Sequence, residues 1–196
     1  MLFRNQRFNV LFFLIIFAAL YYSFIAYIGI VSPGGKGYSP FLNHYLNIPA
    51  WLTYFMCTSA KTLLQFGGYD VYQKAPNNVS IHGSLGVNII WACLGYGVMS
   101  FWVAFIAAHK ARWLYKIKWI GIGIASIVVI NIIRIASIPL AFHYNWKRYT
   151  AIEVHFLFNV VCYILIVGLA ALFVYRYQRY SRIVNNNRSI KKIAGA

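Results

Sequence analysis

Cysteine is the residue type in this sequence best suited to covalent catalysis, and Cys93 occupies the most informative position. It falls within residues 86–97, where a polar segment gives way to a long apolar run. Buried cysteines commonly act only as small apolar side chains. A base and a cation brought to the same place would instead favour the thiolate, which is the nucleophilic form. Gly95, two residues later, would let a substrate backbone approach closely.

Arg134 is the cation best placed to act on such a thiol, because it lies inside a second apolar run. A guanidinium within a membrane span is costly to insert and usually faces a protein interior or a wet cavity. Asn131 lies one turn earlier on the same helix face and could orient it. Arg134 could stabilise a developing negative charge, a substrate carboxylate or a lipid phosphate. A structural Arg134 would instead pair with backbone carbonyls or reach toward the headgroups.

The candidate base is His155, which opens the last apolar run, with Asn159 one turn later. Histidines at a membrane interface are common, and only this position at the end of a span singles it out. Cys57 and Cys162 are interpreted as packing residues, because the first lies on an amphipathic stretch and the second within an apolar run. The candidate catalytic residues are Cys93, Arg134 and His155, with Asn131, Asn159 and Gly95 in supporting roles.

The composition places these residues in a membrane protein. Hydrophobic residues make up 61% of the 196-residue chain and charged residues only 10%, whereas a soluble domain has about a quarter charged. Eighteen lysines and arginines stand against two carboxylates, Asp70 and Glu153, and cations between apolar runs indicate topology and anionic lipid rather than nucleic acid. Two carboxylates argue against paired-acid catalysis, and isolated cysteines argue against a zinc site or a thiol–disulfide relay. No metal or cofactor is expected.

Four apolar runs are predicted to cross the membrane as helices, since each is long enough for a hydrocarbon core of ~30 Å at ~1.5 Å per residue. They cover residues 10–31, 87–108, 119–142 and 153–175. The first could be a signal peptide, but it is longer than the usual apolar region and no small-residue cleavage pattern closes it. We therefore expect a retained span and a single membrane domain over residues 1–196.

Two segments between the first and second spans are predicted to have different structures. Residues 49–66 mix threonine, serine, lysine and glutamine with apolar residues, a pattern typical of an amphipathic helix at the membrane interface. Residues 69–84 alternate on both sides of a Pro-Asn-Asn turn and predict a short β-hairpin. Residues 176–196 form a basic tail, whose end from residue 185 onward is expected to be disordered.

The basic residues predict the orientation. If the helix at 49–66 lies flat, twelve of the eighteen lysines and arginines fall on the side of the two termini. If it crossed, the 110–118 loop and the tail would both face outward, against the positive-inside rule. We therefore predict an all-α integral protein of the cytoplasmic (inner) membrane, a four-helix transmembrane bundle with both termini cytoplasmic. The amphipathic helix and the hairpin would lie on the extracytoplasmic side.

Helix geometry brings the candidate residues to one depth. Cys93 lies sixteen residues before His109 and Arg134 sixteen residues after Lys118, so each is roughly 24 Å from the cytoplasmic boundary. His155 begins the last span on the outer side. Three groups from three helices are thus expected to converge beneath the hairpin, on the extracytoplasmic side.

In this order the residues resemble those of a known family. A helix-entry cysteine followed by x-Gly (residues 93–95), Asn-x-x-Arg on the next span (residues 131–134) and a histidine opening the last span (residues 155–159) look like the exosortase/archaeosortase family of membrane cysteine transpeptidases. The resemblance covers roughly residues 69–166, and the short chain looks like the small exosortase subfamilies. After the cysteine, the family often has a small or polar residue where this chain has Leu94.

The resemblance implies a role for each residue. Cys93 would be the nucleophile, Arg134 would stabilise the oxyanion or the thiolate, and His155 would be the general base and acid. The substrate would be a secreted protein with a C-terminal sorting signal made of a short motif, an apolar helix and a basic end. Cleavage at the outer face would pass through a thioester that water or an amine resolves. The expected partners are the sorting-signal helix and anionic lipids.

Two other functions are compatible with the same residues. In a non-enzymatic membrane assembly or scaffold subunit, Arg134 would bind a lipid headgroup or a partner carboxylate, and Cys93 would only pack. In a small transporter, Arg134 would be the site for an anion or a lipid. Transporters usually show repeated or interrupted helices, and the sequence has no internal repeat.

Overall fold

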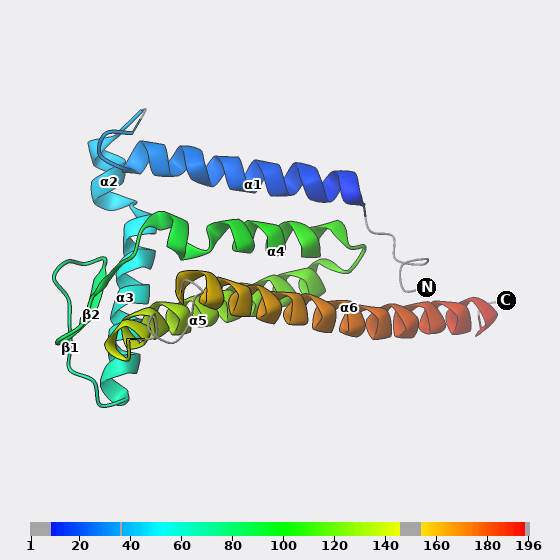
Figure 1. Cartoon of the computed structure of the whole chain (residues 1–196). Helices are drawn as coiled ribbons and strands as arrows, with labels where there is room; N and C mark the ends of the chain where they lie inside the picture. The colour runs from blue at the N-terminus through cyan, green and yellow to red at the C-terminus, as the bar shows by residue number, and fades with distance from the viewer. Residues whose placement is uncertain (1–8, 36, 146–153, 195–196) are drawn as a thin grey trace.

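The computed structural model describes residues 9–35, 37–145 and 154–194, with the backbone alone for residues 92, 154, 155, 157, 158 and 183–194. Most of this chain is helical, with a small antiparallel sheet (Figure 1). The elements in order are α1 Val10–Val31, α2 Pro40–Tyr45, α3 Ile48–Phe66, β1 Val71–Tyr72, β2 Asn78–Ile81, β3 Val87–Asn88, the 3-10 helix η1 Trp91–Leu94, α4 Tyr96–Ala108, α5 Trp113–His143 and α6 Val154–Ala194.

Within the described residues, three helical segments are long and apolar enough to cross a membrane. They are Val10–Val31, Trp113–His143 and the part of α6 from Asn159 to Arg182. The α4 helix is also apolar but has 13 residues. The chain therefore has the helices of an integral membrane protein.

Asparagine caps, and in α3 also a proline in the first turn, explain why α1 and α3 begin where they do. The Asn9 side chain accepts a hydrogen bond from the Phe12 N–H at 3.1 Å, and α1 begins between them. The Asn47 side chain accepts from the Ala50 N–H at 3.0 Å, with Pro49 in the first turn of α3. These caps satisfy N–H groups that have no partner within the helix.

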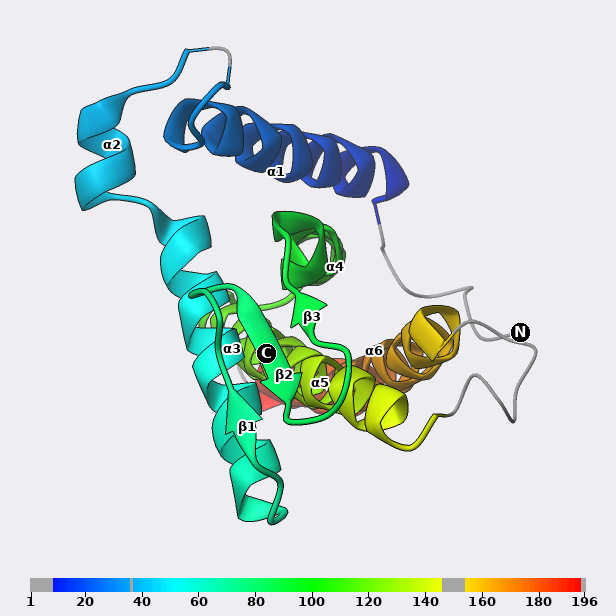
Figure 2. The ribbon, with the colours of Figure 1, turned by 60° about the vertical axis from the view of Figure 1, so that its left-hand side comes forward.

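The α5 helix is the central element. It contacts α3, α4, α6 and the sheet, whereas α1 packs mainly on α4. Figure 1 shows α1, α4, α5 and α6 running side by side, with α3 crossing at one end. Figure 2 shows the sheet at this same end, in front of α3 and α5. One end of the bundle is thus built from α3 and the sheet, and the other from the α4–α5 connection.

Two hydrophobic clusters hold the bundle together. At the sheet end, Met56 and Leu64 of α3 pack with Val79 of β2 and Ile135 of α5. Further along the bundle, α4, α5 and α6 share a second cluster of Trp102, Ile106, Ile127, Ile166, Phe173 and Tyr177. Residues of α5 belong to both clusters, so this helix connects the cluster at the sheet end with the cluster further along the bundle.

The sheet differs from the expected hairpin over residues 69–84. Its strand order is β1-β2-β3, so a third strand at Val87–Asn88 joins the two expected strands. The Asn78 side-chain amide donates to the Asn88 side-chain oxygen at 2.7 Å, which ties β2 to β3. A Cβ on Gly86 would lie 1.8 Å from Oγ of Ser80, so the close approach of the two segments requires glycine there.

The second expected span, at residues 87–108, is divided in the structure. Residues 87–88 are strand, residues 91–94 are a 3-10 helix, and α4 begins only at Tyr96. Gly95 separates the last two elements in a left-handed conformation, with φ of +74°. Cys93 therefore lies in a short turn before the helix, because the backbone changes direction at Gly95.

The last two helices are longer than expected. The α5 helix begins at Trp113 rather than at residue 119, and α6 begins at Val154, beside the expected start at 153, and continues through the basic tail to Ala194. The tail was expected to be disordered from residue 185. Neither glycine nor proline occurs between residues 176 and 194, so nothing in this stretch forces the helix to end.

Gly123 in α5 is predicted to be required for helix packing. Trp102 is fully buried and donates from Nε1 to the Trp119 carbonyl at 3.0 Å, and a Cβ on Gly123 would lie 1.8 Å from that Nε1. We expect Gly123→Ala to lower the free energy of unfolding by about 1–3 kcal/mol through overpacking. The measurement is thermal unfolding of the purified chain in detergent.

Gly121→Ala is the matched control. It lies one half-turn away in the same helix, and a Cβ there meets nothing within 4 Å. We expect it to be neutral or stabilising, because alanine favours a helix over glycine by up to about 1 kcal/mol. Equal unfolding temperatures for the two variants would contradict the packing seen around Trp102.

Candidate active site

A cavity of about 290 Å³ lies where η1 and the start of α4 meet α5 and α6. It is lined by Ile90, Cys93, Gly95, Val98, Ile127, Ile130, Asn131, Arg134, Asn159, Cys162, Tyr163 and Ile166. The cavity therefore combines thiol, amide and guanidinium groups with a mostly aliphatic wall.

The turn that carries Cys93 is held in place from α5. The Cys93 N–H donates to the Ile90 carbonyl at 2.8 Å, closing the turn of η1. Asn131, which is buried, donates from Nδ2 to the Leu94 carbonyl at 3.1 Å. A Cβ on Gly95 would lie 2.3 Å from the same Nδ2, so glycine is needed both for the positive φ and for this contact.

Leu94, the residue that departs from the family pattern, does not line the cavity. Its side chain is fully buried in the cluster shared by α3, the sheet and α5. Only its carbonyl takes part in the arrangement, as the acceptor for Asn131. An apolar residue at this position thus stabilises the turn from the core side and leaves the space beside Cys93 open.

Arg134 reaches the cavity from α5, one turn after Asn131. Among the lining residues that the structure describes, it is the charged one. Asp70 lies directly before β1, where its carboxylate is 3.7 Å from the imidazole of His82. The cavity is therefore a place where a guanidinium meets apolar surface, which suits an anion formed within it.

His155 lies in the first turn of α6, and its side chain is outside the described part of the structure. Its backbone position is one helical turn before Asn159, which lines the cavity. The structure thus brings together Cys93, Gly95, Asn131, Arg134 and Asn159, and the backbone of His155 lies one helical turn before the last of these.

Cys162 lines the cavity, although its place within an apolar run had indicated a packing residue. It lies one turn after Asn159 on α6 and shares the cavity with Cys93 and Arg134. The signal in the sequence was its spacing of three from Asn159, which puts both on one helix face. The cavity therefore contains two thiols, and an experiment on one needs the other as its control.

Cys57 has the environment of a packing residue. It is fully buried on α3 within the cluster near the sheet. Burial raises the pKa of its thiol to about 11. No group of three His, Cys, Asp or Glu side chains that could hold a metal ion occurs in the described ranges.

Comparison with protein-family models, with curated proteins and with solved structures finds no match for this chain. The candidate site therefore rests on the positions of the residues that resemble those of exosortases. Of these, Cys93, Gly95, Asn131, Arg134 and Asn159 line the same cavity.

Because Cys57 and Cys93 lie in different environments, we expect a small maleimide to alkylate them at different rates at pH 8. A pKa of about 11 in place of 9.0 lowers the thiolate fraction of Cys57 at pH 8 by about a hundredfold. Its labelling should rise about tenfold per pH unit up to pH 10, because the thiolate fraction grows until the pKa is reached. Cys93 is half-buried at the wall of the cavity and should label at pH 8.

Variants that keep one cysteine each separate the two signals. Cys57→Ala with Cys162→Ala leaves Cys93, and Cys93→Ala with Cys162→Ala leaves Cys57. The readout is the mass shift of the intact chain with time. Labelling of Cys57 at pH 8 as fast as that of a small free thiol would show that its burial is not as described.

Proposed function

We propose that this chain is a membrane cysteine transpeptidase or protease of the exosortase type, which cleaves C-terminal sorting signals of secreted proteins. The observation that carries the proposal is that Cys93 and Arg134, 41 residues apart in sequence, line one cavity. Asn131 supports it by hydrogen bonding to the backbone directly after Cys93. A packed thiol would not need a cation and an amide brought to it from another helix.

The proposed topology has four spans, with α4 completing the bundle formed by α1, α5 and α6. The 13 residues of α4 rise about 20 Å, and η1 and the sheet extend the chain beyond it. The Asn9 N–H lies 3.5 Å from the Ala108 carbonyl, so α1 begins where α4 ends. That end carries the basic residues of the α4–α5 connection and would be cytoplasmic, which leaves α3 and the sheet on the outer surface.

The chemistry begins as the Cys93 thiol loses its proton and its sulfur attacks the carbonyl carbon of the scissile peptide bond. His155 accepts the thiol proton, and the carbonyl oxygen becomes an oxyanion beside the Arg134 guanidinium. As the carbon–nitrogen bond breaks, His155 returns the proton to the leaving amine, and a thioester remains on Cys93. Attack by water or by an acceptor amine then releases the product and restores the thiol.

Arg134 is suited to the oxyanion because its charge acts within a cavity whose wall is partly aliphatic. Electrostatic stabilisation is stronger there than in water, since little solvent screens it. Its position is anchored by α5, which packs against α3, α4 and α6. The donor is thus arranged before the charge develops, which is the condition under which such a group lowers a barrier.

The substrate's apolar helix would lie against the bundle in the bilayer while its short motif enters the cavity. The cavity wall offers Val98, Ile127, Tyr163 and Ile166 to an apolar segment. Tyr163 and neighbouring residues of α6 also expose apolar surface to the surroundings. A C-terminal signal with an apolar helix would match this surface, and its basic end would remain on the cytoplasmic side.

Replacing Cys93 by alanine should abolish processing while leaving the chain folded in the membrane. The measurement compares the C-terminal peptides of secreted proteins from cells that express the wild type or the variant. Proteins ending in a short motif, an apolar helix and basic residues should lose that end with the wild type and keep it with Cys93→Ala. Cys162→Ala is the matched control, because it removes the other thiol of the cavity and should leave processing intact. Intact processing by Cys93→Ala would reject the proposal.

Arg134→Lys keeps the charge but removes the planar fork of donors. We expect the rate of signal cleavage to fall by about a hundredfold or more, the size commonly seen when one oxyanion donor is removed. The unfolding temperature of the purified variant serves as the control for folding. An unchanged rate would show that Arg134 is not a catalytic donor.

A further inference from the structure

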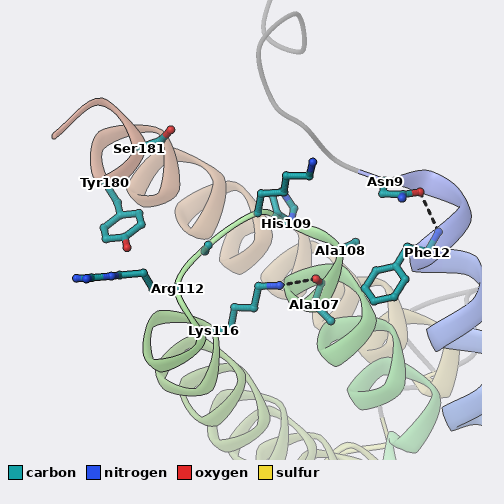
Figure 3. A pocket seen from close by; sticks show the side chains of 11 residues that line it. Asn9, Phe12, Ala107, Ala108, His109, Arg112, Lys116, Tyr180 and Ser181 are labelled. Carbon is teal, nitrogen blue, oxygen red and sulfur yellow. Dashed lines mark hydrogen bonds between the residues drawn. The ribbon is translucent and has the colours of Figure 1, made fainter. Parts of the chain in front are cut away.

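A second cavity, of about 720 Å³, lies at the end of the bundle opposite the sheet. It is formed where the α4–α5 connection meets the start of α1 and the later turns of α6 (Figure 3). Its lining residues are Asn9, Phe12, Ala107, Ala108, His109, Lys110, Ala111, Arg112, Lys116, Tyr180 and Ser181. It is distinct from the cavity at Cys93, and the proposed cleavage reaction makes no use of it.

The charge in this cavity is positive. Lys110, Arg112 and Lys116 line it, and no carboxylate is among its described lining residues. Lys116 donates from Nζ to the Ala107 carbonyl at 2.7 Å, which places its charge inside the space, as Figure 3 shows. Lys110 and Arg112 are exposed and able to turn toward a ligand. Three cations that share a cavity with no carboxylate among its described lining residues favour an anion.

His109 does not add to this charge. It is buried and donates from Nδ1 to the Phe105 carbonyl at 2.7 Å. Burial lowers the pKa of its imidazole, and the charge of the nearby Lys116 lowers it further. The ring is therefore neutral, and the attraction for an anion comes from the two lysines and the arginine.

The position of this cavity at the helix ends and its apolar lining favour a lipid over a soluble anion. The apolar segments of α1, α5 and α6 all reach this end, at Val10, Trp113 and Arg182. The ends of membrane-spanning segments lie at the level of the lipid headgroups. Phe12, an exposed residue of α1, adds an apolar wall, and the space is much larger than a phosphate ion. A phosphate joined to glycerol and the first acyl carbons would contact both the cations and this wall.

We infer that this cavity binds the headgroup of an anionic phospholipid such as phosphatidylglycerol. The phosphate would accept hydrogen bonds from Lys110 and Arg112, with Lys116 at the inner wall. Because Asn9 and Phe12 lie at the start of α1 and Lys116 lies on α5, the lipid would bridge two helices that both pack on α4.

Native mass spectrometry of the full-length chain in dodecyl maltoside tests this site. The probes are dioctanoyl phosphatidylglycerol, dioctanoyl phosphatidylcholine and inorganic phosphate. We expect the wild type to bind the first at least about tenfold more tightly than the second. The Lys110→Gln, Arg112→Gln double variant should lose about thirtyfold in affinity for phosphatidylglycerol, since each basic residue contributes roughly a fivefold change.

The matched control is the Lys118→Gln, Arg182→Gln double variant. Both residues are exposed at the same end of the bundle, and neither lines the cavity. This variant removes the same number of positive charges. It should lose less than about threefold in affinity for phosphatidylglycerol, because Lys118 and Arg182 attract the lipid only through long-range electrostatics that salt screens. Equal losses in the two double variants would show diffuse attraction without a site, and would overturn the inference.

Two further outcomes would also overturn it. One is a wild-type chain without preference for phosphatidylglycerol over phosphatidylcholine, a result that depends on no variant. The other is binding of inorganic phosphate without binding of either lipid, which would assign the cations to a soluble anion. Because none of these measurements involves peptide cleavage, the result is independent of whether Cys93 is a nucleophile.

Discussion

The hydrogen bond from the Asn131 side chain to the Leu94 carbonyl is the contact on which the candidate site depends. The chain around Cys93 is neither a continuous helix nor part of the sheet, so its backbone groups need partners from elsewhere. Asn131 supplies one of them, and Gly95 makes the close approach possible. A turn anchored in this way can hold a thiol in a defined position, which a frayed helix end could not do.

The same contact explains why one helix organises the rest. Asn131 and Arg134 are one turn apart on α5, so the residue that anchors the Cys93 turn and the residue that carries the guanidinium line the same cavity. Ile135, a turn after Asn131, packs in the cluster near the sheet, and Ile127, a turn before it, packs against α4 and α6. Residues that pack in the two clusters thus alternate along α5 with residues that line the cavity.

The two ends of the bundle have different character. At one end, the sheet and α3 bury Leu94 and surround the turn that carries Cys93. At the other, lysines and an arginine gather in a cavity beside the start of α1. The proposed peptide cleavage and the inferred lipid binding thus belong to opposite ends of the bundle, and α4 and α5 extend between these ends.

Local properties of the sequence were sufficient to predict the three long apolar helices, the helix before the sheet, and the shared face of Asn131 and Arg134. They did not predict that residues 87–108 divide into a strand, a 3-10 helix and a 13-residue helix. Hydropathy, helix period and charge depend on neighbouring residues alone. The third strand, the turn at Cys93, the burial of Leu94 and the place of Cys162 in the cavity were decided by the tertiary structure. Each depends on a contact between distant segments, such as Gly86 with Ser80 or Gly95 with Asn131, which no local pattern reveals.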